Sequence, residues 1–314
     1  MRPLITHIDT ARNGFISNLR GTRDLEDSIS VKPKLSGRKT TTPRTLSTKD
    51  STKDTDTSAS LNPRRNYILA ALPDEEYTRL APHLELVELP RGEILYRFGE
   101  HLKYAYFPTT ATAALLCTMD DGTSVEVAVV GHEGILGIST FLGSSGALTQ
   151  ATVLNPGSGY RINAKVLKQE ASDYRGSFQP ILMRYTQTLI AQMAQTTGCI
   201  RRHTVEQQLC RWLLLNFDRV PSGNLEMTQE LMANMLGVRR ESITEVAGKL
   251  QLAGLISYRR GHIEVLDRPG LETQACECYN VVKKELCRLH SELVPNCHAN
   301  STRIPVTNSR LATA

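Results

Sequence analysis

The apolar pattern of the chain changes near Ser177, and this change constrains the fold more than any other feature of the sequence. Before it, short runs of apolar and β-branched residues alternate with turn residues, a pattern typical of antiparallel strands. After it, apolar residues recur at every third or fourth position, which is the period of amphipathic helices. The sequence therefore predicts an α+β fold, in which an antiparallel β-roll precedes a long helix and a small helical domain.

Six segments are predicted to form the strands of the roll. Turn residues at 90–93, 120–122 and 155–157 separate the segments in pairs, so we expect three hairpins. The segments are Leu84–Leu89, Ile94–Phe98, Thr112–Met119, Thr123–Val130, Ala151–Leu154 and Tyr160–Ile162.

The middle hairpin has the period of a strand pair with two unlike faces. Val125, Val127 and Val129 alternate there with Glu126 and Ala128. Because successive side chains of a strand point to opposite faces, the alternation predicts one buried face, with the valines, and one wet face, with Glu126.

Residues 175–203 are predicted to form one long amphipathic helix. A helix of this length needs a partner for its apolar stripe, and a second copy of itself is the simplest one. We therefore expect a homodimer through residues 178–200. The alternative, that the helix packs against its own roll, stays open. The stripe consists of Ile181, Leu182, Tyr185, Leu189, Ile190, Met193 and Ile200.

Three further helices are predicted after the long one. Residues 204–207 have the form of a capping box and begin a helix that ends before Pro221. Thr228 is a good N-cap for a short second helix, and Gly237 can adopt the left-handed conformation that ends it. A third helix, Arg239 to Leu252, follows. Two short helices about a glycine turn form a helix-turn-helix, whose second helix reads the major groove of DNA.

The second helix of this motif carries the residues predicted to read bases. Its apolar side holds Ile243, Val246, Ala247 and Leu250. On the other side an Arg can bond guanine and a Glu can accept a bond from cytosine. Two apolar segments around 259–262 predict a hairpin, or wing, whose basic tip lies along phosphates. The predicted DNA contacts are Thr228, Arg239, Arg240, Glu241, Thr244, Glu245, Arg259 and Arg260.

The chain ends and the net charge complete the predicted organisation. Residues 1–63 are rich in polar and charged residues and are predicted to be disordered. Apolar runs fall far short of the roughly 20 residues that cross a membrane, and no export signal begins the chain, so we expect a cytoplasmic protein without membrane contact. The net charge of +5 agrees with a nucleic-acid partner but does not require one. The expected domains are 64–174 (roll), 175–203 (long helix), 204–270 (winged helix-turn-helix) and 271–314 (C-terminal helix and tail).

Three stretches of the sequence resemble the Crp/Fnr family of dimeric regulators, over about residues 66–270. Gly131–Gly137 (GHEGILG) is similar to the glycine-bracketed turn of the family's cyclic-nucleotide-binding roll. Cys199–Asp218 is similar to the end of its dimer helix and the first helix of its reading domain, and Met227–Ile256 to its helix-turn-helix. The resemblance implies a sensor roll, a dimerising helix and a winged reader that acts on RNA polymerase at promoters.

The sensor and the reader both depart from the family pattern. The resemblance places an effector pocket at Gly134, Gly137, Ile138, Thr149 and Gln150. Members that bind cyclic AMP have a Glu where this chain has Ile138, and an Arg that the stretch at Thr149 lacks. Without that countercharge a cyclic phosphate loses a charge-assisted bond, so we expect no physiological binding of cyclic AMP. In the reader, Glu245 stands where the family often has an Arg, so we expect a different operator.

The seven cysteines are expected to be reduced thiols, without a metal or cofactor. No cysteine precedes Cys117, which argues against an iron-sulfur cluster of the family's kind. Lone histidines such as His101 and His132 could ligate haem but are more typical of ordinary polar positions. A late group of cysteines and histidines could bind zinc, but its spacing matches no common zinc module, so we expect ordinary thiols there. That group is Cys276, Cys278, Cys287 and Cys297, with His290 and His298 nearby.

The sequence favours a homodimeric, sequence-specific DNA-binding regulator whose signal is unknown. No Ser-His-Asp order, P-loop or metal-hydrolase motif is present, so we expect no enzyme. Two alternatives stay open. One is a ligand-binding regulatory module that acts on a protein partner without specific DNA recognition, and the other is a thiol redox enzyme, which needs a cysteine of lowered pKa.

Overall fold

The computed structural model describes residues 62–144, 146–173, 175–220 and 224–293. All of them belong to one unit, Asp50–Ala314. The predicted disordered tail lies outside the described residues except at its end, where Asn62 caps a 3-10 turn, η1 (Pro63–Arg65). Cys297 and His298 also lie outside them. Among the helices that are described, none combines the length and the apolar character needed to span a membrane.

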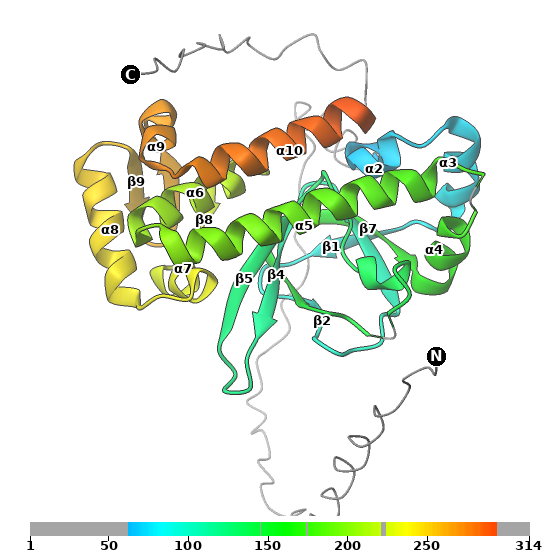
Figure 1. The fold of residues 1–314 in the computed structure, drawn as a ribbon, viewed down its shortest axis with the longest axis horizontal. Coiled ribbons are helices and arrows are strands. Elements are labelled where there is room, and N and C mark those ends of the chain that lie inside the picture. The colour runs from blue at the N-terminus through cyan, green and yellow to red at the C-terminus, as the bar shows by residue number, and fades with distance from the viewer. Residues whose placement is uncertain (1–61, 145, 174, 221–223, 294–314) are drawn as a thin grey trace, which may run out of the picture. The chain divides into compact units, whose positions relative to one another are not determined.

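The first domain is an antiparallel roll of two sheets, as predicted (Figure 1). One sheet has the strand order β1-β7-β3 and the other has the order β2-β6-β4-β5. The strands are β1 (Glu85–Leu89), β2 (Ile94–Tyr96), β3 (Tyr104–Pro108), β4 (Thr112–Thr118), β5 (Ser124–Val130), β6 (Gln150–Asn155) and β7 (Gly157–Asn163). β3 is a strand that the sequence reasoning missed.

Of the three predicted hairpins, the structure forms the middle one, β4–β5, and the other two are wrong. β1 pairs with β7 and β2 pairs with β6, so β1 and β2 are not partners. β6 and β7 belong to different sheets. At Gly157 the chain crosses so close to the preceding loop that a Cβ atom would lie 2.6 Å from the backbone nitrogen of Ala111. Turn residues mark where the chain bends, but closure of the roll decides which strands pair.

The burial predicted for β5 is also wrong, because a β-bulge interrupts its alternation. Leu115 pairs with Ala128 and Leu116 pairs with Glu126, so Val127 is the extra residue. A bulge moves the residues beyond it to the other face of the sheet. The bulge places Glu126 on the same outer face as Val129, and Trp212 of the second domain covers that face, so Glu126 is 6% exposed instead of wet, while Val127 is only partly buried.

Helices flank the roll and join it to the second domain. The helices α2 (Tyr67–Ala70) and α3 (Asp74–Leu80) and the 3-10 turn η2 (Ala81–His83) precede the strands, and α4 (Ala164–Ala171) follows them. The 3-10 turn η3 (Ile138–Thr140) lies between β5 and β6. The long helix α5 (Phe178–Arg202) matches the prediction. Much of its apolar stripe packs into the core of the roll. The alternative prediction, that this helix packs against its own roll, is therefore correct for Ile181, Leu182, Tyr185 and Leu189. Ile190 and Ile200 face outward, 60% and 42% exposed.

The second domain begins at the predicted capping box. The Thr204 hydroxyl accepts a hydrogen bond from the Gln207 backbone N–H, and the Gln207 side chain accepts one from the Thr204 backbone N–H. The helices are α6 (Val205–Phe217), α7 (Gln229–Leu236), α8 (Arg240–Leu252) and α9 (Arg268–Gln274). A sheet of order β8-β10-β9 completes the domain, with β8 (Asn224–Glu226), β9 (Ile256–Arg259) and β10 (His262–Val265). The wing hairpin was predicted, and β8 was not.

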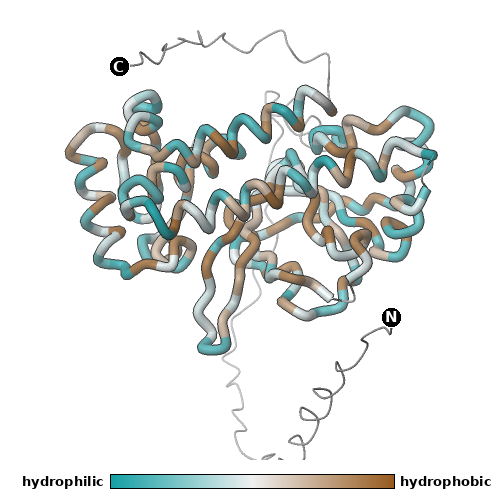
Figure 2. Tube along the Cα trace, viewed as in Figure 1, coloured by the Kyte–Doolittle hydropathy of each residue, from teal (hydrophilic) through white to brown (hydrophobic). Residues whose placement is uncertain are grey.

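The reading domain packs against the outer face of the four-stranded sheet. Ala114, Leu116, Val129 and Leu154 of the roll share one core with α6–α8, whereas their neighbours along the strands line the inside of the roll. In Figure 2 the arms of the β4–β5 hairpin are hydrophobic near the sheet and its tip is hydrophilic. Both faces of this sheet are therefore buried.

Two buried polar contacts cross this boundary. The Trp212 indole N–H donates to Glu126 Oε2 at 3.0 Å. Arg219 Nε donates to Glu133 Oε1 at 2.7 Å, and the two side chains are 2% and 9% exposed. Glu133 lies within the glycine-bracketed turn, and a Cβ on Gly131 would come within 3.2 Å of the Arg219 side chain. Gly131 thus serves the packing of the two domains.

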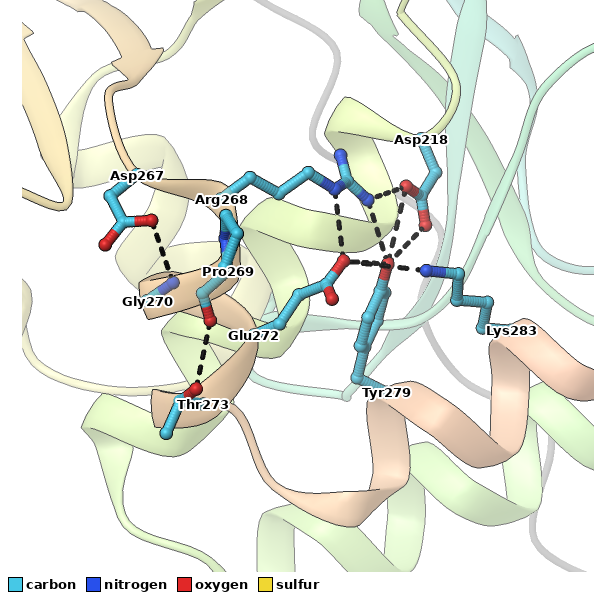
Figure 3. A network of polar contacts seen from close by, with 9 residues as sticks. All are labelled: Asp218, Asp267, Arg268, Pro269, Gly270, Glu272, Thr273, Tyr279 and Lys283. Carbon is cyan, nitrogen blue, oxygen red and sulfur yellow. Dashed lines mark hydrogen bonds and ion pairs between the residues drawn. The ribbon is translucent and has the colours of Figure 1, made fainter. Parts of the chain in front are cut away.

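The C-terminal helix α10 (Glu277–Leu293) runs alongside α5 and contacts both domains (Figure 1). At its start the Tyr279 hydroxyl donates to Asp218 Oδ2 at 3.1 Å and accepts from Arg268 at 2.9 Å. Figure 3 shows this network, in which Arg268 also pairs with Asp218 and Glu272. At its far end the His290 ring stacks on Tyr67 of α2, with the ring centroids 4.4 Å apart.

Replacement of Glu126 by Gln is predicted to remove a pH dependence of stability. Burial raises the pKa of Glu126 to about 7. An acid whose folded pKa is raised stabilises the fold fully below its unfolded pKa, and this contribution is lost as the pH rises through the folded pKa. We expect wild-type stability to fall by up to about 3 kcal/mol between roughly pH 5 and pH 8. The neutral Gln keeps an acceptor for Trp212 and should flatten this profile.

Urea denaturation at several pH values, followed by the fluorescence of Trp212, the only tryptophan of the chain, measures the effect. Glu88→Gln, at an exposed position of β1, is the matched control and should keep the wild-type slope. An unchanged slope in Glu126→Gln would contradict the assignment.

Candidate nucleic-acid interface

The helix-turn-helix is formed by α7, a turn at Gly237 and α8. The Thr228 hydroxyl accepts a hydrogen bond from the Leu231 backbone N–H at 3.1 Å, so Thr228 caps α7 as predicted. Gly237 ends α7 with a φ of 65°, a left-handed conformation that suits glycine. The next helix begins at Arg240 and not at Arg239, which is its N-cap residue and forms no side-chain capping bond.

The two sides of α8 differ as the sequence predicts. Ile243, Val246, Ala247 and Leu250 are buried in the core of the domain. Arg239, Arg240, Glu241, Thr244 and Glu245 are exposed. The structure therefore brings the predicted base-reading residues to one open surface at the start of the helix.

Three of these exposed residues, Thr244, Glu245 and Arg240, also contact neighbouring side chains of the protein. The Thr244 hydroxyl donates to Gln229 Oε1 at 2.7 Å and so ties α8 to α7. Glu245 pairs with Lys249 at 2.8 Å, which lowers the pKa of Glu245 through that hydrogen bond and charge. Arg240 has a long contact to exposed Glu230, with Nε 3.9 Å from Oε2. Such surface pairs are weak and give way readily to a stronger partner.

The wing stands next to the cap of α7. Its turn contains Arg260 with a φ of 51° and Gly261 with a φ of 85°, the two positive values of a tight hairpin turn. Arg259 and Arg260 are exposed. The Met227 backbone N–H donates to the Gly261 carbonyl at 2.6 Å, and the Tyr258 hydroxyl donates to the Met227 carbonyl at 3.2 Å. These bonds hold the basic tip at a fixed position beside Thr228.

The roll contacts the helix-turn-helix at its turn, which sequence reasoning did not foresee. A Cβ on Gly237 would lie 3.3 Å from the side chain of Val125. A cavity lies at this contact, lined by residues 119 and 121–125 of the β4–β5 hairpin and by residues 233, 234, 237 and 238 of the reader. No sequence signal locates such a contact, because it depends on how the two domains pack.

The five residues of the predicted effector pocket lie in or beside the core of the roll. A Cβ on Gly134 would lie 2.3 Å from the Tyr185 ring, so only a glycine at this position leaves room for α5. The Gly137 backbone N–H donates to the Tyr96 hydroxyl at 3.1 Å, and the Thr149 side chain lies near that hydroxyl. Tyr96, which is 6% exposed, thus occupies the space between these two segments. Ile138 is in η3, and Gln150 bonds Thr152 at the start of β6.

Two family models match the chain, one in each domain. The cyclic nucleotide-binding domain matches residues 86–174, and the Crp-like helix-turn-helix domain matches residues 207–274. No curated protein matches. The matched ranges contain the roll and the helix-turn-helix with its wing.

Solved structures share the fold at low sequence identity. FixK2 from Bradyrhizobium japonicum is 16% identical with a TM-score of 0.54, over 62% of this chain and 98% of that one. A putative Crp/Fnr-family transcriptional regulator from Eubacterium rectale is 19% identical with a TM-score of 0.54, over 67% and 98%. The c-di-GMP-responsive global regulator CLP from Xanthomonas campestris is 15% identical with a TM-score of 0.51, over 62% and 100%. By its two family models and its domain order, the chain is a DNA-binding transcription regulator of the Crp/Fnr type.

Proposed function

We propose that the protein is a cytoplasmic homodimer that binds a specific DNA sequence, acts on RNA polymerase and has no catalytic activity. The observation that carries this is the open start of α8, where Arg240 and Glu241 are exposed beside the fixed basic wing. Arg and Glu at this position can bond guanine and cytosine edges in the major groove. The wing arginines add phosphate contacts, which set affinity and orientation.

A seam on α5 supports the dimer. We call seam a row of six exposed residues on α5 that recur at alternating spacings of four and three, as at the a and d positions of a coiled coil. Three of the six, Met183, Ile190 and Ala194, are apolar. The side chains that the roll buries lie on the opposite side of the helix. The seam consists of Met183, Gln187, Ile190, Ala194, Thr197 and Arg201.

Pairing of two such helices would give a two-fold symmetric reader. Each subunit would then present its α8 to one half-site of a palindrome, with centres about 34 Å apart, one turn of DNA. Because each of the two half-sites is read by one α8, the base preferences of Arg240 and Glu241 should appear twice in every bound sequence.

Substitution of Arg240 by Ala is predicted to weaken binding to the selected operator by about 1 to 3 kcal/mol and to relax one base position in each half-site. Arg97→Ala, at an exposed arginine of the roll, is the control and should bind like wild type. Selection from random duplexes followed by binding titrations measures both effects. Equal weakening for all sequences would make Arg240 a phosphate contact. Indifference of the wild type to duplex sequence would favour a regulatory module that acts on a protein partner.

Alanine at both Arg259 and Arg260 should weaken specific and non-specific binding alike. Each lost phosphate contact reduces the slope of log affinity against log salt by about 1. Titrations at several salt concentrations measure this slope. A change of base preference without a change of slope would contradict the assignment of the wing to phosphates.

Substitution of Ile190 by Glu is predicted to convert the dimer to a monomer, because it places two carboxylates at the centre of the seam. Light scattering coupled to size-exclusion chromatography gives the mass. Phe98→Glu, at a position of the roll that is 66% exposed, introduces the same charge elsewhere and should leave the dimer intact. A dimeric Ile190→Glu would place the interface elsewhere.

We propose that the signal sensed by the roll is not cyclic AMP. Tyr96 fills the space between the segments of Gly137 and Thr149, and neither segment carries an arginine for the phosphate. Stabilisation in a thermal-shift titration at micromolar cyclic AMP would overturn this.

A further inference from the structure

Four side chains with metal-binding atoms meet where α5 ends. They are Cys199 and His203 at the end of α5, Cys276 just before α10 and Cys278 in its first turn. One ligand atom from each, three sulfurs and an imidazole nitrogen, lies within 4.8 Å of every other. The three cysteines are buried and His203 is half-buried.

The distances suit one small ion. A tetrahedral Zn²⁺ with Zn–S bonds of about 2.3 Å holds its sulfur ligands about 3.8 Å apart. Here Cys199 Sγ lies 3.5 Å from Cys276 Sγ, and Cys278 Sγ lies 3.5 Å from His203 Nδ1. Three thiolates and one imidazole form a common donor set of closed, structural zinc sites.

Neighbouring groups support and orient these four. His203 Nε2 lies 3.3 Å from Glu277 Oε1, so the ring can donate to a carboxylate while Nδ1 faces the sulfurs. This is the arrangement that fixes the tautomer of zinc-bound histidines. The Gln195 side chain donates to Cys278 Sγ at 3.0 Å.

A buried positive charge beside the group points to an anionic centre. Arg211 is 4% exposed, bonds Thr196 at 3.3 Å, and has no hydrogen-bond partner for its Nε atom among the described residues. Among the described residues Arg211 forms no ion pair with a carboxylate within 4.0 Å, and the charge of Glu126 reaches it only at longer range. Zn²⁺ with three thiolates and a neutral imidazole carries one net negative charge, which would balance a buried guanidinium close by.

We propose that Cys199, His203, Cys276 and Cys278 bind one Zn²⁺ and that the ion fastens α10 to the junction of α5 and α6. On binding, three thiol protons pass to water, and the ion accepts three thiolates and the Nδ1 lone pair. The site stands independently of DNA binding, because no predicted DNA contact belongs to it. This ligand set differs from the late group of cysteines in the sequence, because Cys287 is exposed and the two completing ligands come from the end of α5.

The test uses the full-length chain without a histidine tag, purified under reducing conditions. We expect about one zinc per chain by elemental analysis. After removal of zinc, titration with Co²⁺ should give the visible bands of a tetrahedral cobalt-thiolate centre. Because this measurement uses the unsubstituted protein, a negative result cannot be attributed to a variant that fails to fold. Absence of both zinc and the cobalt bands in reduced wild-type protein overturns it, as does a stable Cys199–Cys276 disulfide in place of metal uptake.

Substitutions then identify the ligands. Cys199→Ser and Cys278→Ser should each lower zinc to below about one fifth per chain. Cys287→Ser, on the exposed side of the same helix α10, is the matched control and should retain full zinc. Glu277→Gln should keep the cobalt spectrum but weaken zinc affinity about 10-fold, as loss of a histidine's carboxylate partner does. Equal zinc loss in Cys287→Ser would contradict the ligand set.

Discussion

The ion pair between Arg219 and Glu133 joins the two domains, and much of the structure depends on it. Both side chains are almost inaccessible to water, and loss of one partner from such a pair typically costs about 3 to 5 kcal/mol. Burial, the largest single effect, raises the pKa of Glu133, but the charges of Arg219 and His132 and the hydrogen bonds to Glu133 together outweigh it, so the pKa is lowered overall. The pair therefore stays ionised and holds the glycine-bracketed turn of the sensor against the residues that directly follow α6.

Local patterns predicted the reading domain well. Thr204, Thr228 and Gly237 act within a few residues of their own positions, and the buried side of α8 follows from a single helical period. The reading surface could thus be predicted because its positions depend on the sequence near them. The surface that α5 leaves open for a second copy is narrower than the predicted apolar stripe, since the roll covers four residues of that stripe.

Features that depend on distant contacts could not be predicted. The bulge at Val127 reverses the faces of β5, and only its pairing with β4 reveals it. Two of three hairpins were wrong because strand partners lie far apart along the chain. The late cysteines pointed to Cys276 and Cys278 only, since Cys199 and His203 reach them only when α10 folds back along α5.

The course of α10 has a mechanical consequence. Its start is bonded to the reader through Tyr279, and its far end packs into the core of the roll through Leu289 and Leu293. Any rotation of one domain relative to the other must first release one of these attachments. Such a rotation must also break the Arg219–Glu133 ion pair, so the attachments of α10 add to the free energy that it costs.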